Sequence, residues 1–525
     1  MVGCLTASIP FSCGRRSATS LWRLRWEGNA APFEPNGTAS GFDPTIPNPK
    51  AGGRLGALVF AGNGPGRTGS RSLSDGWYKG FGPRLGIAYQ ATPKTVVRAS
   101  GGIYYAPGFR TRLIAYGFTN GNSISSSTGY GPVYNWTTDG YPDDFPRAPF
   151  IDPAFQNGQN VSSILPGTSR MPQILTWTFS IQRELTRNLA FEATYVGSHS
   201  THLILSSQQS NMNTLDPQYL SLGNLLFQDI LSPAAIAAGF TPPYEEFTSQ
   251  SIRTVGQALR PYPQYRDVTE EWGNHGISRY NSLQLKVTKR YSNGLTLLAF
   301  YTWSKNMTNV DGGPIDLGPN DGAVQNPRNR DGEVSVSNQG PPHVFVASGS
   351  YELPFGPGKR YLTSNGFLKY LVGGWQIAGY CRYTSGAALT ITSGNPLSAL
   401  GFPNIRANYV GGDVYVTTNP REFDPAMDVY LNRNAFAAPA TFELGNTARV
   451  LDWVRGFTGK SESISLSKRT PITERFRAVL RADAQNPFNF VRWNNPNTNI
   501  TSSNFGMVTS AQSGRTIQLG ASIEF

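Results

Sequence analysis

The sequence contains no long hydrophobic run, although it has 525 residues. No stretch approaches the ~20 apolar residues that a membrane-spanning helix needs, which excludes helical membrane proteins. Charge is also scarce, because Asp, Glu, Lys and Arg make up 15% of the chain, against about 25% in a typical soluble protein. Aromatic residues reach 12%, with 57 glycines and 38 prolines. This composition fits a β-barrel with an apolar outer face and long polar loops, and it also fits a secreted all-β protein.

Cysteine is nearly absent. The three cysteines, Cys4, Cys13 and Cys381, show no metal-ligand spacing. His199 and His202 lie three residues apart, but no carboxylate stands at a ligand spacing beside them, so we expect an incidental pair in a loop. The sequence therefore predicts no metal site and no cofactor. With so few cysteines, an exported chain must draw its stability from its sheet.

Positive charge is present but does not cluster. The net charge is +12, from 45 Lys and Arg against 33 Asp and Glu, yet no basic run exceeds pairs such as Arg15–Arg16. Nucleic-acid binding requires clustered cations on a recognisable module, so it is not expected. The chain also lacks a Gly-x-Ser-x-Gly elbow and a His-Glu-x-x-His motif. We therefore do not expect an enzyme.

The first twenty residues are a poor secretory signal. They lack a charged start before an apolar core, and Pro10 and Cys13 interrupt their apolar stretch. We expect residues 1–20 to be an atypical N-terminal segment and residues 21–525 to form one domain.

Strand pairs joined by short turns recur along the chain. Each strand has about the 9–11 residues that a tilted membrane strand requires. Ser292-Asn293-Gly294 is a strong hairpin turn between two of them. The pairs are Gly82–Gln90 with Lys94–Ala106, Leu175–Leu185 with Asn188–Gly197, Tyr280–Tyr291 with Leu295–Ser304, and Ser461–Thr470 with Arg475–Gln485.

Long segments rich in Gly, Pro, Asn and Tyr separate these hairpins, at about residues 108–171, 198–277, 305–342 and 393–460. Loops of this length are uncommon in a compact soluble domain. Short turns on one side and long loops on the other are the rule in outer-membrane barrels. The sequence therefore predicts an all-β fold: an antiparallel transmembrane β-barrel, partial or incomplete, with about twelve recognisable strands and long extracellular loops.

The last strand alternates between an apolar and a polar face and ends on an aromatic residue. Its apolar face consists of Ile517, Leu519, Ala521, Ile523 and Phe525. A barrel must close on its last strand, whereas a soluble protein gains little from an exposed terminal strand. A terminal strand ending in Phe also resembles the signal that outer-membrane proteins present to their assembly machinery. These five residues are our candidate assembly signal.

The same alternation predicts the orientation of the preceding strand. Phe476 and Leu480 should face lipid, together with the apolar face of the last strand. Arg475, Arg477 and Arg481 should face the interior, because a row of cations cannot lie in a dry environment.

Several segments in order resemble Oar-like TonB-dependent transporters of the outer membrane, from about Leu21 to the end. They are Leu24–Glu27, Gly56–Tyr105, Asn213–Leu220, Leu259–Tyr265, Tyr280–Lys305, Pro342–Phe345 leading to Tyr351–Gly356, and Asn486–Asn489 through Phe525. No single motif is specific, and their order carries the resemblance.

The resemblance implies the barrel of a TonB-dependent transporter or receptor that takes up an unknown ligand across a Gram-negative outer membrane. Its partners would be outer-membrane lipid and the barrel-assembly machinery. Relatives also carry a signal peptide, a carboxypeptidase-regulatory-type domain, a TonB-contacting segment and a plug before the barrel. We recognise none of these here, so we expect a fragment that engages the TonB system only if a plug region is present.

Two other functions remain open at this stage. One is a plugless outer-membrane barrel that serves as a surface adhesin or structural protein through its loops. The other is a soluble secreted β-protein that binds glycans. Continuous apolar bands on the outer face would favour either barrel over the soluble protein.

Overall fold

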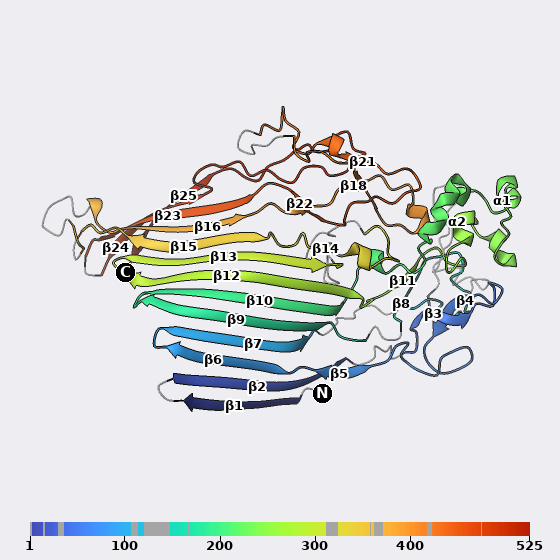
Figure 1. Cartoon of the computed structure of the whole chain (residues 1–525), viewed down its shortest axis with the longest axis horizontal. Coiled ribbons are helices and arrows are strands. Elements are labelled where there is room, and N and C mark those ends of the chain that lie inside the picture. The colour runs from blue at the N-terminus through green and yellow to red at the C-terminus, as the bar shows by residue number, and fades with distance from the viewer. Residues whose placement is uncertain are drawn as a thin grey trace, which may run out of the picture.

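The computed structural model describes residues 3–13, 16–29, 36–106, 114–119, 148–165, 169–310, 324–356, 359–361, 371–416, 423–473 and 475–525. Parts of the expected long connections, including residues 120–147 and 311–323, lie outside the described residues. One large antiparallel sheet dominates, and smaller elements gather at one of its ends (Figure 1).

The sheet has 15 strands, of which thirteen follow one another edge to edge in chain order. Two short strands are attached to this path: β5 (Trp77–Phe81) pairs with β2, and β14 (Ser335–Val336) pairs with β13. The thirteen are β1 (Gly3–Cys13), β2 (Arg16–Asn29), β6 (Arg84–Thr92), β7 (Thr95–Tyr105), β9 (Gln173–Thr186), β10 (Leu189–Leu203), β12 (Gly276–Ser292), β13 (Leu295–Thr308), β15 (His343–Glu352), β16 (Trp375–Thr384), β23 (Gly459–Pro471), β24 (Arg477–Gln485) and β25 (Thr516–Glu524). We call these thirteen strands the wall.

The wall confirms the predicted all-β antiparallel barrel strands. All four expected hairpins form, as β6–β7, β9–β10, β12–β13 and β23–β24. β1 and β25 stand at the two ends of the strand order, and no pairing joins them over the described residues, so the barrel is not closed there. Residues 3–13 form β1, which pairs with β2. The division between residues 1–20 and residues 21–525 stays a prediction.

Short turns join most of the strands at one end of the wall, where the 22 residues between β15 and β16 are the exception, and long connections join them at the other end. The turn Asn293–Gly294 takes positive φ at both residues, 53° and 80°, as a tight hairpin turn of this kind requires. At the opposite end, 72 residues or more separate β10 from β12 and β16 from β23. In Figure 1 the long connections collect at the right of the sheet.

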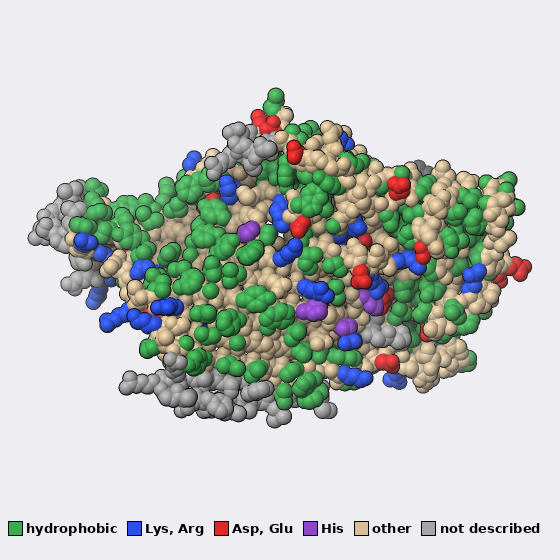
Figure 2. Space-filling view, viewed as in Figure 1, with side chains coloured by type: hydrophobic (Ala, Val, Ile, Leu, Met, Phe, Trp, Pro, Cys, Tyr) green, Lys and Arg blue, Asp and Glu red, His purple; other side chains and the backbone are tan. Residues whose placement is uncertain are grey.

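The register separates an apolar face of the wall from a polar one. Leu285 of β12 lies opposite Tyr301 of β13 and Ala193 of β10, and directly paired residues share a face. Figure 2 shows hydrophobic side chains spread over the strands on the face turned to the viewer. Large apolar residues of this face that are exposed include Leu85, Ile87, Trp177, Phe179, Ile181, Tyr195, Leu283, Leu297, Trp303, Phe345, Tyr351, Ile377 and Leu480.

The opposite face is lined by polar side chains that bond across strands. Arg98 Nη1 donates to Gln182 Oε1 at 2.8 Å. Ser100 and Thr178 share a hydroxyl hydrogen bond of 2.6 Å. A thin sheet with one apolar and one polar face fits an interface between lipid and a wet lumen.

The long connections contain short strands and helices of their own. β8 (Val161–Ser163) pairs in parallel with β11 (Val268–Glu270), although they come from different connections. The other strand pairs are β3 (Ser40–Pro47) with β4 (Leu55–Phe60), β17 (Ala388–Leu389) with β22 (Leu451–Arg455), β18 (Thr392–Ser393) with β19 (Ile405–Arg406), and β20 (Asn408–Tyr409) with β21 (Phe436–Ala437). The helices are η1 (Ser207–Ser210), η2 (Pro217–Phe227), α1 (Pro233–Ala237), η3 (Glu245–Ser249), α2 (Val255–Ala258), η4 (Asp331–Glu333), η5 (Ser398–Leu400) and η6 (Arg433–Ala435). Over the described residues, none of the helices is long and apolar enough to span a membrane.

The hydrophobic core of the molecule lies in these connections. The largest side chains that are fully buried are Arg449, Tyr265, Phe42, Phe60, Phe247, Phe402, Leu58, Leu215, Leu226, Ile230, Ile391 and Leu397, and each belongs to a long connection. We call residues 36–76, 148–165, 204–275, 324–341, 385–458 and 486–515, as far as they are described, the loop assembly. It packs like a soluble domain placed at one end of the wall.

Candidate functional site

The predicted assembly signal lies on one face of β25. Ile517, Leu519, Ala521 and Ile523 stand opposite Ala484, Ala482, Leu480 and Ala478 of β24. Phe525 is 98% exposed, and its ring centroid lies 6.5 Å from that of Phe476. The structure therefore brings all five residues together on the apolar face. Their role in assembly stays a prediction.

The arginines of β24 lie on the other face, as the alternation predicted. Arg477 and Arg481 stand opposite Glu524 and Gly520 of β25. Arg481 Nε also lies 2.8 Å from Asp483 on the same strand. This exposed pair contributes little stability, but its place agrees with a wet polar face.

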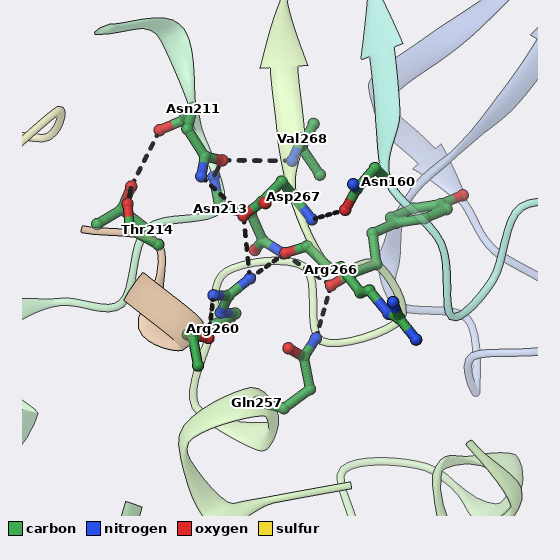
Figure 3. A network of polar contacts seen from close by, with 12 residues as sticks. Asn160, Asn211, Asn213, Thr214, Gln257, Arg260, Arg266, Asp267 and Val268 are labelled. Carbon is green, nitrogen blue, oxygen red and sulfur yellow. Dashed lines mark hydrogen bonds and ion pairs between the residues drawn. The ribbon is translucent and has the colours of Figure 1, made fainter. Parts of the chain in front are cut away.

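A second candidate site, which the sequence did not indicate, is the polar framework of the loop assembly. Asn213 follows η1 and precedes η2 in the chain, and its side chain is fully buried. Figure 3 shows it among the other residues of this framework. Its Nδ2 donates to the carbonyls of Tyr262, Tyr265 and Arg266 at 3.0, 2.9 and 2.9 Å. Its Oδ1 accepts the Tyr262 N–H at 2.8 Å. One side chain thus satisfies the backbone of a whole turn that has no secondary structure of its own.

Arg260 joins this turn to another connection. Its Nη1 lies 3.3 Å from Asp267 Oδ1 and also donates to the Arg266 carbonyl, and its Nη2 donates to the Ala399 carbonyl at 2.6 Å (Figure 3). Burial lowers the pKa of Arg260, and the nearby Asp267 carboxylate partly offsets that effect. A hydrogen-bonded guanidinium therefore fixes the connection between β10 and β12 against that between β16 and β23.

A buried ion pair makes a further junction. Arg406 Nη1 lies 2.6 Å from Glu333 Oε2, and both side chains are buried. Glu333 Oε1 accepts the N–H groups of Gln325 and Asn326 at 3.2 and 3.0 Å. The Gln325 side chain in turn accepts the Arg406 and Gly445 N–H groups at 2.8 and 3.0 Å. Such a satisfied network fixes a unique arrangement, even though a buried ion pair adds little net stability.

Arg449 ties the loop assembly to the wall. It is fully buried, and it donates from Nε to the Glu333 carbonyl at 2.9 Å and from Nη2 to the Thr308 carbonyl at 2.6 Å. Thr308 is the last residue of β13. Burial lowers the pKa of Arg449 to about 10, so it stays charged at neutral pH and anchors the network to a strand end.

One histidine–carboxylate pair lies in the same loop assembly. His275 Nε2 lies 2.9 Å from Glu270 Oε2, with Arg330 Nη2 3.9 Å from the same oxygen. Across the part of the chain that the structure describes, no group of three or more His, Cys, Asp or Glu could hold a metal ion. His199 and His202 lie in β10, with His202 at a bulge, so the expectation that they lie in a loop was wrong. The arrangement can hold loops rigid and present polar groups.

Two residues of this framework lie in segments that the sequence analysis singled out for the family resemblance alone. Two of the segments that carry the family resemblance, Asn213–Leu220 and Leu259–Tyr265, contain Asn213 and Arg260. Their spacing gave no sign that they meet. The polar residues of the framework have no periodicity, which is why alternation alone did not find them.

The comparisons with known proteins agree with the sheet. A family model described as "Outer membrane beta barrel domain" matches residues 24–518. A search of the curated proteins finds no match.

Among solved structures, the chain is similar to the FrpB iron transporter from Neisseria meningitidis, with 11% identity and a TM-score of 0.38 over 99% of this chain and 44% of that one. It is also similar to the outer membrane transporter YddB from Escherichia coli, with 10% identity and a TM-score of 0.39 over 100% and 54% of the two chains. The third is the ferric-catecholate import receptor Fiu from Escherichia coli K12, with 10% identity and a TM-score of 0.37 over 100% and 44%. This chain thus spans about half the length of these structures, and TM-scores this low carry no functional inference.

Proposed function

Since the chain belongs to the outer membrane beta barrel domain family, we propose that it forms the barrel part of a TonB-dependent transporter that takes up a solute. The outer membrane of a Gram-negative bacterium is then its site of action. Outer-membrane lipid covers the apolar face, and the barrel-assembly machinery inserts the strands. The TonB system acts on it only where a plug region is present. The proposal includes no catalytic role.

The observation that carries this proposal is the packed loop assembly at one end of the wall. Its buried side chains and bonded networks hold connections from different parts of the chain in one arrangement. Fixing loops before a ligand arrives lowers the entropic cost of binding. Rigid loops over a polar lumen therefore suit recognition of a solute before its passage.

A plugless surface adhesin is the second candidate. The same rigid loops would serve it, because binding residues are commonly presented on loops by a rigid scaffold. The soluble secreted protein that the composition left open is not compatible with membership of an outer-membrane family.

Solute depletion from a mixed medium separates the two candidates. Cells that carry the intact gene, cells with the gene deleted and cells without TonB grow in the same medium, and mass spectrometry follows the solutes that remain. We expect at least one solute to disappear only with the gene and TonB both present. Equal depletion in all three strains, with surface attachment lost in the deletion strain, would instead support the adhesin.

A further inference from the structure

A pocket lies where the polar face of β16 and β23 meets the loop assembly. Its volume is about 410 Å³, which is within the range of ~300–1,000 Å³ typical of small-molecule sites. Arg382 of β16 lies opposite Ser461 of β23, and Thr384 lies opposite Gly459, so two adjacent strand ends form one side. Residues 492–495 and Gln512, from the connection between β24 and β25, form the other side.

The pocket is cationic. Arg382 and Arg492 line it, and its described lining includes no Asp or Glu. Lys460 also borders it, but it stands opposite Tyr383 on the apolar face, with Nζ 4.7 Å from the centroid of the Phe490 ring. Neither arginine forms an ion pair with a carboxylate within the described ranges. Elsewhere in the loop assembly, Arg253, Arg260 and Arg406 each have a carboxylate partner. Two guanidinium groups without a carboxylate partner thus line one cavity.

Arg492 also has an unsatisfied donor. Its Nε–H is buried and meets no acceptor among the described residues. A buried donor without an acceptor costs free energy, which a ligand oxygen would recover. The Nε–H groups of Arg260 and Arg266 share this condition, so the place of Arg492 at a cavity is what distinguishes it. Guanidinium groups prefer planar oxyanions, which they bind with two parallel hydrogen bonds.

The segment that carries Arg492 is held in place. The Gln512 N–H donates to the Arg492 carbonyl at 2.8 Å, and Trp493 bridges to Ala511. The indole of Trp493 packs edge-on against Phe423, with 5.8 Å between ring centroids. The arginine is therefore presented from a fixed backbone, which lowers the cost of binding a small ligand.

We propose that this pocket binds a small polyhydroxylated carboxylate of the uronic-acid class. Arg382 and Arg492 take the carboxylate. The hydroxyl groups of Thr384, Ser385 and Ser461 and the amides of Asn495 and Gln512 supply partners for the ligand hydroxyls. The inference rests on the proposed function only where it treats the bound ligand as the solute that is imported. Binding itself is measured without transport.

Calorimetric titration of the full chain refolded in detergent tests the proposal, with glucuronate as the probe. We expect saturable binding of glucuronate and none of glucose, which lacks the carboxylate. Arg492→Gln and Arg382→Gln should each weaken glucuronate binding by about tenfold or more, because each loses a charge-assisted contact. Arg477→Gln is the matched control, since Arg477 lies on the polar face at the short-turn end of β24 and outside the pocket.

The outcomes that overturn the proposal are distinct. The site is removed if glucuronate does not bind the wild-type protein, or if both pocket variants bind glucuronate as tightly as the wild type does. If inorganic phosphate binds as tightly as glucuronate, the hydroxyl groups of the ligand contribute nothing to binding, and the proposed ligand class is wrong. Two variants on different elements guard against a folding defect in either one. If the protein binds glucuronate but cells do not take it up, the proposed transport function is wrong and the pocket stands. If cells take up glucuronate but the protein does not bind it, this pocket is wrong and the transport function stands.

Discussion

The wall and the loop assembly are built on opposite principles. In the wall, large apolar side chains such as Phe179, Trp303 and Leu519 are exposed, and hydrogen bonds between strands provide the order. In the loop assembly, Leu215, Phe402 and their neighbours are fully buried in a core. The loop assembly thus supplies its own apolar partners, whereas we propose that lipid is the apolar partner of the wall.

The difference shows where each region can tolerate change. A wall side chain is constrained by the face on which it lies, because lipid accepts any apolar shape but no charge. A loop-assembly side chain is constrained by its shape, because protein interiors are close-packed. Substitutions that reverse polarity should damage the wall, and substitutions that change volume should damage the loop assembly.

The largest effect is expected from opening a cavity in the loop assembly. Phe402 packs with leucines of two different connections and is fully buried. Phe402→Ala should destabilise the loop assembly by about 3–5 kcal/mol. Hydrogen exchange should show faster exchange in residues 204–275 and 385–458 and unchanged protection in the wall strands. Met427→Ala, at a side chain that is 83% exposed in the same connection, is the control and should change neither region.

A charge on the apolar face should have the next largest effect. Leu285 lies near the middle of β12 with Tyr301 and Ala193 beside it. Leu285→Arg should cost about 2–4 kcal/mol in a bilayer, measured as urea unfolding in lipid vesicles. Gln284→Arg places the same charge one residue away on the polar face and should cost far less. Equal losses in the two variants would contradict the assignment of the faces.

Removal of Phe525 should have a smaller effect on stability and a large one on assembly. An apolar side chain contributes at most ~1–3 kcal/mol when buried, and Phe525 is almost fully exposed here. Deletion of Phe525 should leave refolding into detergent nearly normal, while the amount of protein in the outer membrane falls severalfold on quantitative blotting. Glu524→Gln, at the adjacent polar-face position, should leave both unchanged. Undiminished membrane levels after the deletion would show that the last strand is only structural.

The smallest expected effect is a change in how the thermal stability of the protein depends on pH. The N–H of Leu231 and then the guanidinium of Arg253 hold the pKa of Asp229 below its ordinary value. A depressed carboxyl pKa stabilises the folded state above the ordinary pKa of aspartate, and this contribution is lost as the pH falls through the folded value. The thermal midpoint of the wild type should therefore fall slightly more than that of Asp229→Asn between about pH 6 and about pH 3. An identical acid dependence in both proteins would assign no role to this pair.

The sequence was sufficient for the four hairpins and the last strand of the wall because strand alternation is local, whereas it did not assign β1, β15 or β16. Leu283, Leu285 and Val287 indicate their common face without knowledge of any partner, and Asn293–Gly294 marks its own turn. The last strand, β25, was predicted for the same reason. The loop assembly was not, because its order arises from residues far apart in the chain. Asn48 Nδ2 donates a hydrogen bond of 3.2 Å to the Tyr265 hydroxyl, 217 residues away in the chain. No local sequence pattern predicts such a pair.

The parallel pairing of β8 with β11 has a consequence for the order of folding. These strands come from connections that begin at different hairpins, and Val161 pairs with Val268. In a free chain, joining such distant segments carries a large loop-closure entropy, which rises by about 0.6 kcal/mol for each doubling of the loop. Once β7, β9, β10 and β12 are paired, the ends of both connections are already held side by side. The wall therefore acts as a template, and we expect the outer surface of the protein to mature last, after its strands have entered the membrane.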